Sequence, residues 1–214
     1  MKWGKKNFQH YPWRETIEPW HGLIAEILLQ RTRANNVVPV YSEFIKIFPT
    51  PVDLANASVD EIEKVIFSLG LRWRAPLIQR LGIQLTQLEG KIPREKAELL
   101  KLAGVGPYVA AAWLSFHGSK RGTIIDANVV RFICRLIDQP MDGETRRKKW
   151  LLEIVENMTP IRAWKSYNYA ILDFTMQICS KRPKCEICPI GYKHCKYLQR
   201  NIYERTGIEE WESI

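Results

Sequence analysis

Apolar residues recur at intervals of three and four along most of the chain, which is the spacing of amphipathic and buried helices. Alternating apolar and polar positions, the mark of half-buried strands, are hard to find. Ser58 and Glu61 have the spacing of a capping box, and Gly70 would end the helix that they open. The pattern predicts an all-α fold, with helices at 19–32, 37–48, 58–69, 73–88, 94–102, 107–117, 127–137, 144–158 and 162–178.

The composition is that of a globular protein. The chain has 214 residues, 46% of them hydrophobic, which is enough for one large core or two modest ones. No apolar run approaches the roughly 20 residues of a membrane-spanning helix. The first residues lack the apolar stretch of a secretory signal, so a reducing cytoplasm is the expected compartment.

The charge is strongly basic. A formal net charge of +9 means that lysine and arginine on the surface would attract a polyanion. These residues are dispersed and form no juxtamembrane run, which favours nucleic acid over an acidic membrane as the partner. Charge alone leaves open a basic surface that has no specific partner.

Four cysteines form a C-x5-C-x2-C-x6-C pattern near the end of the chain. Thiolates spaced this closely can converge on one soft metal centre, either tetrahedral zinc or an iron–sulfur cluster. Buried cysteines or disulfides are the alternatives, and a reducing compartment disfavours disulfides. The fifth cysteine, Cys134, lies among apolar residues at helical spacing and is expected to be structural. The candidate metal ligands are Cys179, Cys185, Cys188 and Cys195.

A glycine turn joins two of the predicted helices. Gly104 and Gly106 permit a tight turn and close approach, and Pro107 opens the next helix. The N–H groups at that helix start could receive an anion such as a DNA phosphate. The alternative is an ordinary helix–helix turn with a glycine cap.

Two acidic residues are candidates for chemistry. Asp126 directly precedes a predicted helix, where it would act as N-cap and where a helix N-terminus favours its ionised form. An ionised carboxylate can stabilise the sugar cation that develops when a glycosidic bond breaks. Glu26 stands in an otherwise apolar helix, so it is either an exposed residue or the second carboxylate of a site.

Taken together, Glu26-Ile-Leu-Leu-Gln-Arg-Thr32, Leu102-Ala-Gly-Val-Gly106, Ile125-Asp-Ala-Asn128 and the four cysteines resemble the helix-hairpin-helix DNA glycosylase superfamily, in its endonuclease III and MutY branch. The resemblance covers about residues 10–197. It implies two all-α lobes: a six-helix domain with the hairpin at 21–126, and a cluster domain at 1–20 plus 127–214 with an iron–sulfur loop at 179–195.

The family's activity follows as an expectation. Its members bind double-stranded DNA between the two lobes and flip a mispaired or damaged nucleotide into a pocket, with a side chain wedged into the gap. By resemblance, this chain would do so as a monomer in the cytoplasm, associated with the nucleoid and not with a membrane. Gln30 or Arg31 matches the wedge.

The resemblance also assigns further roles residue by residue. Asp126 matches the aspartate that stabilises the sugar cation. Tyr108 stands where bifunctional members have a lysine that forms a Schiff base, which implies a monofunctional enzyme without lyase activity. The cysteines would hold a 4Fe–4S cluster, with zinc as the alternative. Contacts to the DNA backbone would come from Gly104, Val105, Gly106, Lys181, Arg182 and Lys184.

The target base is narrowed by details of the motifs. Glu26 matches the residue that protonates the leaving purine in adenine glycosylases, but the same helix occurs in thymine–guanine mismatch glycosylases. Tyr108 and D-A-N at Asp126 resemble the thymine branch, because adenine enzymes usually have serine and D-G-N there. The chain also ends 19 residues after Cys195, without room for the accessory domain of typical adenine glycosylases.

The expectation is therefore release of thymine or uracil opposite guanine. An adenine glycosylase without its accessory domain is the alternative, and a non-catalytic iron–sulfur DNA-binding module is a further one. The family usually spaces its cluster ligands C-x6-C-x2-C-x5-C, so the inner pair here is shifted by one residue. Asn168 and Asp173 match family positions that we expect to be structural, and no role is expected for His117 and His194.

Overall fold

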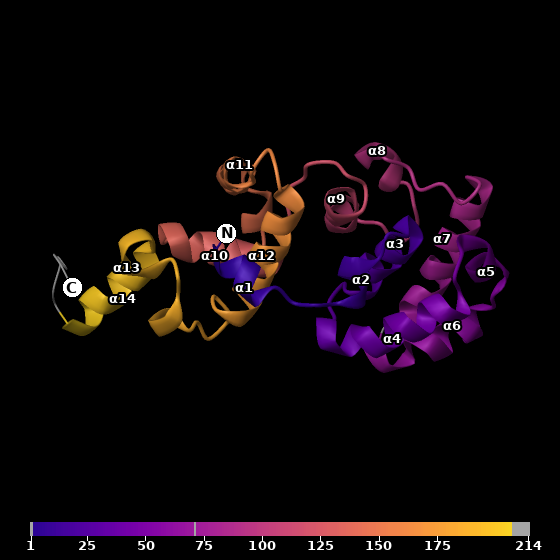
Figure 1. Ribbon diagram of the computed structural model, residues 1–214, viewed down its shortest axis with the longest axis horizontal. Helices are drawn as coiled ribbons and strands as arrows, with labels where there is room; N and C mark the ends of the chain where they lie inside the picture. Colours follow the sequence, from indigo (N-terminus) through magenta and orange to yellow (C-terminus); the bar gives the residue numbers. More distant parts are fainter. Residues whose placement is uncertain (1, 71, 207–214) are drawn as a thin grey trace. The chain divides into compact units, whose positions relative to one another are not determined.

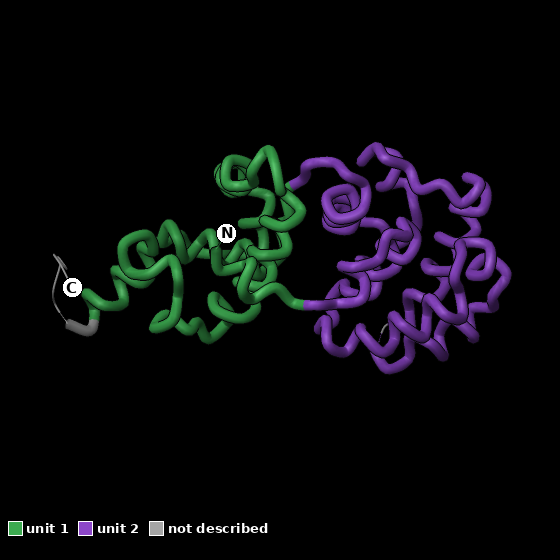
Figure 2. Tube along the Cα trace, viewed as in Figure 1, with its two compact units in different colours: residues 1–9, 123–214 green, residues 10–122 purple. Residues whose placement is uncertain are grey.

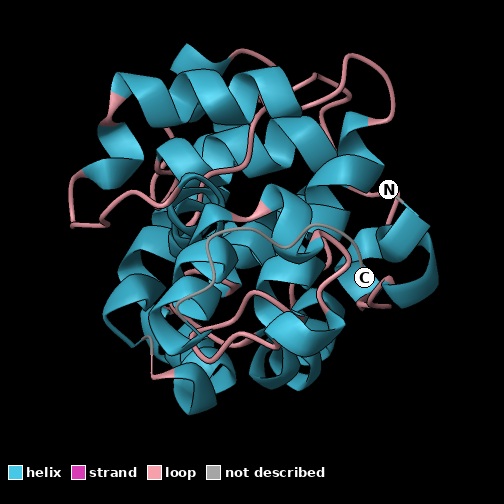
Figure 3. Ribbon diagram, turned by 90° about the vertical axis from the view of Figure 1, so that its left-hand side faces the viewer, coloured by secondary structure: helices cyan, strands magenta, loops and turns pink. Residues whose placement is uncertain are grey.

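The structure is a computed structural model that describes residues 2–70 and 72–206. These residues form helices joined by turns and loops, and none of them forms a strand (Figure 1; Figure 3). The predicted all-α class is confirmed. None of the helices in this part of the chain is long and apolar enough to cross a membrane.

The chain folds as two compact units (Figure 2). Residues 10–122 form one, here called the hairpin unit; the described residues of 1–9 and 123–214 form the other, the cysteine unit. The sequence placed these boundaries after residues 20 and 126. Residues 10–20 join the hairpin unit because Trp13 and Trp20 are buried in its core, and Ile125 packs against the core of the cysteine unit.

The hairpin unit contains both predicted and unpredicted helices. The sequence pattern missed α2 and α5, which span only four and six residues and hold too few turns for a periodic pattern. The predicted helix at 94–102 is reduced to α8, Lys96–Leu99. The others are α2 (Pro12–Glu15), α3 (Pro19–Leu28), α4 (Ala34–Ile47), α5 (Pro51–Asn56), α6 (Val59–Ile66), α7 (Ala75–Gln87) and α9 (Pro107–Phe116), with 3-10 turns at Phe67–Leu69 and Arg72–Arg74.

Local signals set the ends of α6. The N–H of Glu61 donates to Ser58 Oγ at 3.2 Å and the N–H of Ser58 donates to Glu61 Oε2 at 2.8 Å, so the predicted capping box is present. The chain leaves this segment through Gly70, whose φ of 66° lies in the left-handed region that favours glycine. Two short-range motifs therefore mark the start of α6 and the end of the 3-10 turn that follows it.

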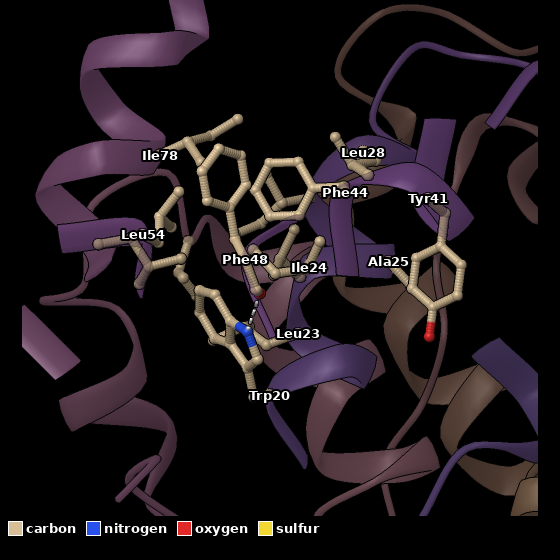
Figure 4. Packing of buried hydrophobic residues seen from close by; sticks show 14 of the residues in the cluster. Trp20, Leu23, Ile24, Ala25, Leu28, Tyr41, Phe44, Phe48, Leu54 and Ile78 are labelled. Carbon is tan, nitrogen blue, oxygen red and sulfur yellow. Dashed lines mark hydrogen bonds between the residues drawn. The ribbon is translucent and has the colours of Figure 1, made fainter. Parts of the chain in front are cut away.

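The core of the hairpin unit is built around α3. Its residues from Gly22 to Leu28 are all buried, and side chains of α4, α5 and α7 pack around them, including Phe44, Leu54 and Ile78 (Figure 4). The Trp20 indole N–H donates to the Phe48 carbonyl at 3.1 Å, as Figure 4 shows. Burial of each such side chain stabilises the fold by about 2 kcal/mol. A polar side chain in this buried part of α3 is therefore surrounded by apolar atoms.

The cysteine unit has a smaller core. In it, α1 (Lys2–Asn7) packs against α12, and a Cβ on Gly4 would lie 2.4 Å from that of Ala170. The predicted helix at 144–158 begins only at Lys149, after a 3-10 turn at Thr145–Arg147. The remaining helices are α10 (Ala127–Ile137), α11 (Lys149–Met158), α12 (Trp164–Gln177), α13 (Gly191–His194) and α14 (Lys196–Thr206), with a 3-10 turn at Cys185–Ile187.

Candidate active site, hairpin and cysteine loop

Glu26 lies near the end of α3, and the structure excludes one of the two interpretations of its sequence context, that of an exposed residue. Its side chain is only 3% exposed. Burial removes the carboxyl group from water and raises the pKa of Glu26 to about 8, against an opposing influence of the positive Arg14. Glu26 is therefore protonated at neutral pH and can donate a hydrogen bond or a proton.

Tyr108 lies on a helix that contacts α3. It is the second residue of α9, is half-buried, and packs against the same apolar core. The Trp113 indole N–H donates to the Pro19 carbonyl at 2.9 Å, and a Cβ on Gly22 would meet the His117 ring at 2.4 Å. The structure thus places Glu26 and Tyr108 on adjacent helices of one unit. The His117 ring, at the end of α9, packs against α3 at Gly22.

The hairpin turn connects α8 to α9. Gly104 has a φ of 75°, which favours glycine, and Gly106 precedes Pro107 at the start of α9. Val105, predicted to contact DNA, has a side chain that is only 6% exposed. Only its backbone is left for such a contact. The Gly106 amide N–H has no acceptor among the described residues.

Gln30 and Arg31, the two candidates for the wedge, differ in their surroundings. The Gln30 side-chain amide donates to the Gly104 carbonyl at 3.1 Å. Arg31 is exposed and has a φ of 59°, a conformation that non-glycine residues rarely adopt and that often marks functional sites. Of the two side chains, Arg31 is the one presented to solvent.

Asp126 lies in the cysteine unit, as the N-cap of α10. Its Oδ1 accepts hydrogen bonds from the backbone N–H groups of Asn128 at 2.9 Å and Val129 at 2.7 Å. Its Oδ2 accepts one from the Asn128 side-chain amide at 2.7 Å. A carboxylate offers about four acceptor positions, so these three bonds hold the group and leave Oδ2 with capacity for one more donor.

The hydrogen bonds around Asp126 continue to the cysteine loop through Arg131. The Arg131 guanidinium donates to Asn128 Oδ1 at 3.0 Å, to the Thr175 carbonyl at 2.9 Å, and from Nη2 to the Cys179 carbonyl at 2.9 Å. Because Asn128 accepts from Arg131 through its oxygen, its amide nitrogen is turned toward Asp126. Arg131 thus connects the first cysteine of the loop to the carboxylate.

Arg135, one helical turn further along α10, holds the start of the loop. Its guanidinium donates to the Ser180 carbonyl at 2.6 Å and the Lys181 carbonyl at 3.1 Å, and lies 3.6 Å from Cys179 Sγ. The same guanidinium lies over the Tyr197 ring, 5.2 Å from its centre, which is within the roughly 6 Å of a cation–π contact. Two arginines of α10 therefore anchor the loop to the helix that Asp126 caps.

The four cysteines line one small cavity of about 30 Å³ that opens to solvent. Burial raises the pKa of the Cys185 thiol, and the charges of the other three cysteines add to this, so the four sulfurs are within electrostatic reach of one another. The backbone N–H groups of Leu198 and Tyr197 donate to Cys195. Within the described residues, however, no three acidic, histidine or cysteine side chains lie close enough together to hold a metal ion as they stand. The cavity walls between the cysteines are mainly apolar, with Phe132, Phe174, Ile178 and Ile190.

The remaining residues singled out in the sequence are either exposed on the cysteine unit or buried in it. Lys181, Arg182 and Lys184 are exposed on the cysteine loop. Cys134 is buried in the core of the cysteine unit, and Asn168 and Asp173 are buried in α12, where Asp173 accepts the N–H of Gln9 at 3.1 Å. His194 is exposed on α13.

Sequence reasoning missed Arg131 and Arg135 and treated them only as part of the dispersed positive charge. One signal was present, since the two arginines are four residues apart and therefore lie on one face of the predicted helix. The sequence contains no sign that their partners are carbonyl groups more than 40 positions away.

The sequence is similar to those of two known DNA glycosylases over most of its length. It is 34% identical to a thymine/uracil-DNA glycosylase of Pyrobaculum aerophilum, over 94% of this chain and 90% of that protein. It is 33% identical to an adenine DNA glycosylase of Buchnera aphidicola, over 90% of this chain but only 55% of that protein.

A solved structure of a thermostable thymine-DNA glycosylase matches the fold with a TM-score of 0.84 and 32% identity, over 93% of both chains. Residues 24–156, which include Glu26, the hairpin, Tyr108 and Asp126, match the model of the HhH-GPD superfamily base excision DNA repair proteins. With a match over most of its length and relatives of this identity, the chain belongs to the HhH-GPD superfamily of base excision DNA repair proteins.

Proposed function

We propose that this protein is a monofunctional DNA glycosylase that flips a thymine or uracil mispaired with guanine and releases it by hydrolysis, leaving an abasic site. The observation that carries this proposal is the 34% identity to a thymine/uracil-DNA glycosylase along nearly the whole of both chains. Because the substrate is chromosomal DNA, we place the enzyme in the cytoplasm, on the nucleoid.

Glu26 would assist the departing base. A protonated carboxyl group in a dry environment can donate its hydrogen to a carbonyl oxygen of the pyrimidine, where negative charge develops as the bond to the sugar breaks. The raised pKa of Glu26 keeps that hydrogen in place at neutral pH. An adenine substrate could be protonated by the same group, so Glu26 does not by itself select the base.

Asp126 would act on the sugar. As the C1′–N bond breaks, the ring gains cationic character that a fixed carboxylate stabilises. Water then bonds to C1′ and gives up one proton, which the remaining capacity of Oδ2 can accept. The bonds to Asn128 and Val129 hold the group in one orientation throughout.

The absence of lyase activity is proposed from Tyr108. A phenol has no amine with which to form an imine at C1′, and the sequence contains no lysine between Lys101 and Lys120. The half-buried ring on α9 would instead form part of the wall against which the base stacks.

Contacts to the DNA backbone would come from both units. The turn at Gly104 and Gly106 presents backbone N–H groups at the start of α9, and the exposed Lys181, Arg182 and Lys184 add positive charge. We assign the wedge to Arg31, because it is exposed while Gln30 is hydrogen-bonded to the hairpin.

We infer that Cys179, Cys185, Cys188 and Cys195 hold a 4Fe–4S cluster. Four thiols on one mainly apolar cavity are a suitable donor set, and the N–H donors of Arg135, Tyr197 and Leu198 next to the sulfurs are of the kind that stabilise thiolate charge. The cluster would supply a rigid cross-link of the loop. Zinc would suit the same ligands, and an absorption spectrum distinguishes the two, because a zinc site is colourless.

The test is incubation of the purified protein with duplexes that contain T:G, U:G, A:G or A:8-oxoguanine, followed by alkali to reveal abasic sites. Release from T:G and U:G, with strand breakage only after alkali, is the expected result. Asp126→Asn, purified in parallel, should release no base but keep its affinity for duplex DNA.

Other outcomes would contradict specific parts of the proposal. Release from A:G or A:8-oxoguanine alone would identify an adenine glycosylase. Breakage without alkali would contradict the monofunctional assignment. Binding of all four duplexes without base release from any would leave a non-catalytic DNA-binding module.

A further inference from the structure

The hairpin turn is held by two glutamine side chains, one from α7 and one from the turn that follows α3. Gln84 of α7 donates through Nε2 to the Lys101 carbonyl at 3.2 Å and accepts the Ala103 N–H through Oε1 at 2.7 Å. Gln30, just after α3, donates to the Gly104 carbonyl at 3.1 Å. The segment from 101 to 104 is thus bonded from two sides.

These bonds matter because packing holds the buried Leu102 and Val105 side chains of the turn but not its two glycines. A Cβ built on Gly104 or on Gly106 would have no atom within 4 Å, so packing does not fix either residue. The peptide between Gly104 and Val105 is instead held at both ends, since its carbonyl accepts from Gln30 and its N–H donates to the Leu102 carbonyl at 3.1 Å. Only the φ and ψ angles of Val105, whose side chain is buried, separate this peptide from the next N–H, that of Gly106, so fixing the peptide limits the direction of that N–H.

The end of α3, from which Gln30 follows, is itself held by a hydrogen bond. The buried Arg74 donates to the Ile27 carbonyl at 3.1 Å, at the last turn of α3, and its guanidinium lies 4.9 Å from the centre of the Trp73 ring. The end of α3 is therefore tied to the start of α7, and Gln84 reaches the turn from α7 itself. Gln84 and Gln30 therefore lie on α7 and directly after α3, two helices that are connected to each other.

We propose that Gln30 is a positioning residue and not the wedge: together with Gln84 it clamps the hairpin turn and aims the Gly106 N–H and the start of α9 at a DNA phosphate. The inference rests on the proposed function, because it requires that the hairpin bind duplex DNA. Insertion of Gln30 into the duplex would break the bond to Gly104 and release one side of the turn.

Three neutral leucine substitutions test this role. Gln30→Leu and Gln84→Leu each remove one side of the clamp without changing the charge. Gln79→Leu is the matched control, because Gln79 lies on the same helix as Gln84 and donates to the Ala57 carbonyl at 2.7 Å, away from the hairpin. Hydrogen exchange of the DNA-free protein should be faster in residues 100–108 of the first two variants only.

Duplex affinity and the rate of base release distinguish a residue that positions the hairpin from one that inserts into the duplex as a wedge. Loss of one hydrogen bond in Gln30→Leu and of two in Gln84→Leu should weaken the affinity of each variant for an undamaged duplex by at least roughly 3- to 10-fold, measured by fluorescence anisotropy. Single-turnover base release at saturating enzyme should stay within about 2-fold of wild type, because the groups that act on the base and sugar are intact. Rescue of release by high enzyme concentration would support positioning.

The opposite pattern would overturn the inference. Unchanged exchange and unchanged duplex affinity in Gln30→Leu, with slower release at saturation, would make Gln30 the wedge. Failure of the proposed function is distinguishable, because it would appear in the wild-type protein as no duplex binding or no base release. Unchanged exchange in a fully active Gln30→Leu variant would overturn the clamp alone.

Discussion

Replacing Glu26 with glutamine is expected to remove much of the pH dependence of the protein's stability between pH 5 and pH 8. Glutamine has nearly the same shape but does not titrate. In the folded protein the pKa of Glu26 is raised from 4.5 to about 8 by burial. Between these values the unfolded chain carries an ionised Glu26 while the folded protein keeps it protonated, so the folded state binds more protons and stability falls as pH rises.

The size of the effect follows from the shift. One pKa unit corresponds to about 1.4 kcal/mol, so a rise from 4.5 to about 8 amounts to about 5 kcal/mol of unfolding free energy once the pH exceeds both values. About 2.5 kcal/mol of this difference should develop between pH 5 and pH 7. Below the unfolded value Glu26 is protonated in both states, and its stabilising contribution is fully present.

The assay is urea unfolding of wild type, Glu26→Gln and Glu43→Gln at several pH values from 5 to 8. Glu43 is exposed on α4 of the same unit and serves as the matched control. Relative to Glu26→Gln, wild type should lose about 2.5 kcal/mol between pH 5 and pH 7, and Glu43→Gln should follow wild type. Parallel profiles for wild type and Glu26→Gln would refute the raised pKa, and with it the proposed proton donor.

Three further predictions concern the rest of the site. Tyr108→Lys places an amine where bifunctional relatives have one, so borohydride should trap a covalent complex with substrate DNA that wild type does not form; a complex with wild type would contradict the monofunctional assignment. Arg131→Lys replaces the planar guanidinium that donates to Asn128, Thr175 and Cys179 at once. Single-turnover base release should therefore fall about 10-fold with duplex affinity unchanged. An unaltered rate would show that the connection to Asp126 has no catalytic role. Cys188→Ser should abolish the iron–sulfur absorbance at about 400 nm and lower the melting temperature. A colourless wild-type protein that contains zinc would refute the cluster.

Several features of this protein depend only on neighbouring residues and could be predicted from the sequence. Ser58 and Glu61 form their capping box within one turn, and Asp126 caps α10 through N–H groups two and three residues away. The four cysteines lie within 17 positions and line one cavity. The apolar spacing that sets the class of the fold is likewise a property of single helices.

Other features required the packing of distant segments. The periodicity of α3 could not tell whether Glu26 faces water, because that depends on which helices cover α3, and its pKa changes with them. The bond from Gln30 to Gly104 spans 74 positions, and those from Arg131 to Cys179 span 48. A hydrogen bond needs its two atoms within about 3 Å in the right direction, a condition that only the folded chain can meet. The sequence by itself therefore determined the helices and the kinds of reactive group, and the tertiary structure decided which of these groups are buried, protonated and held in place.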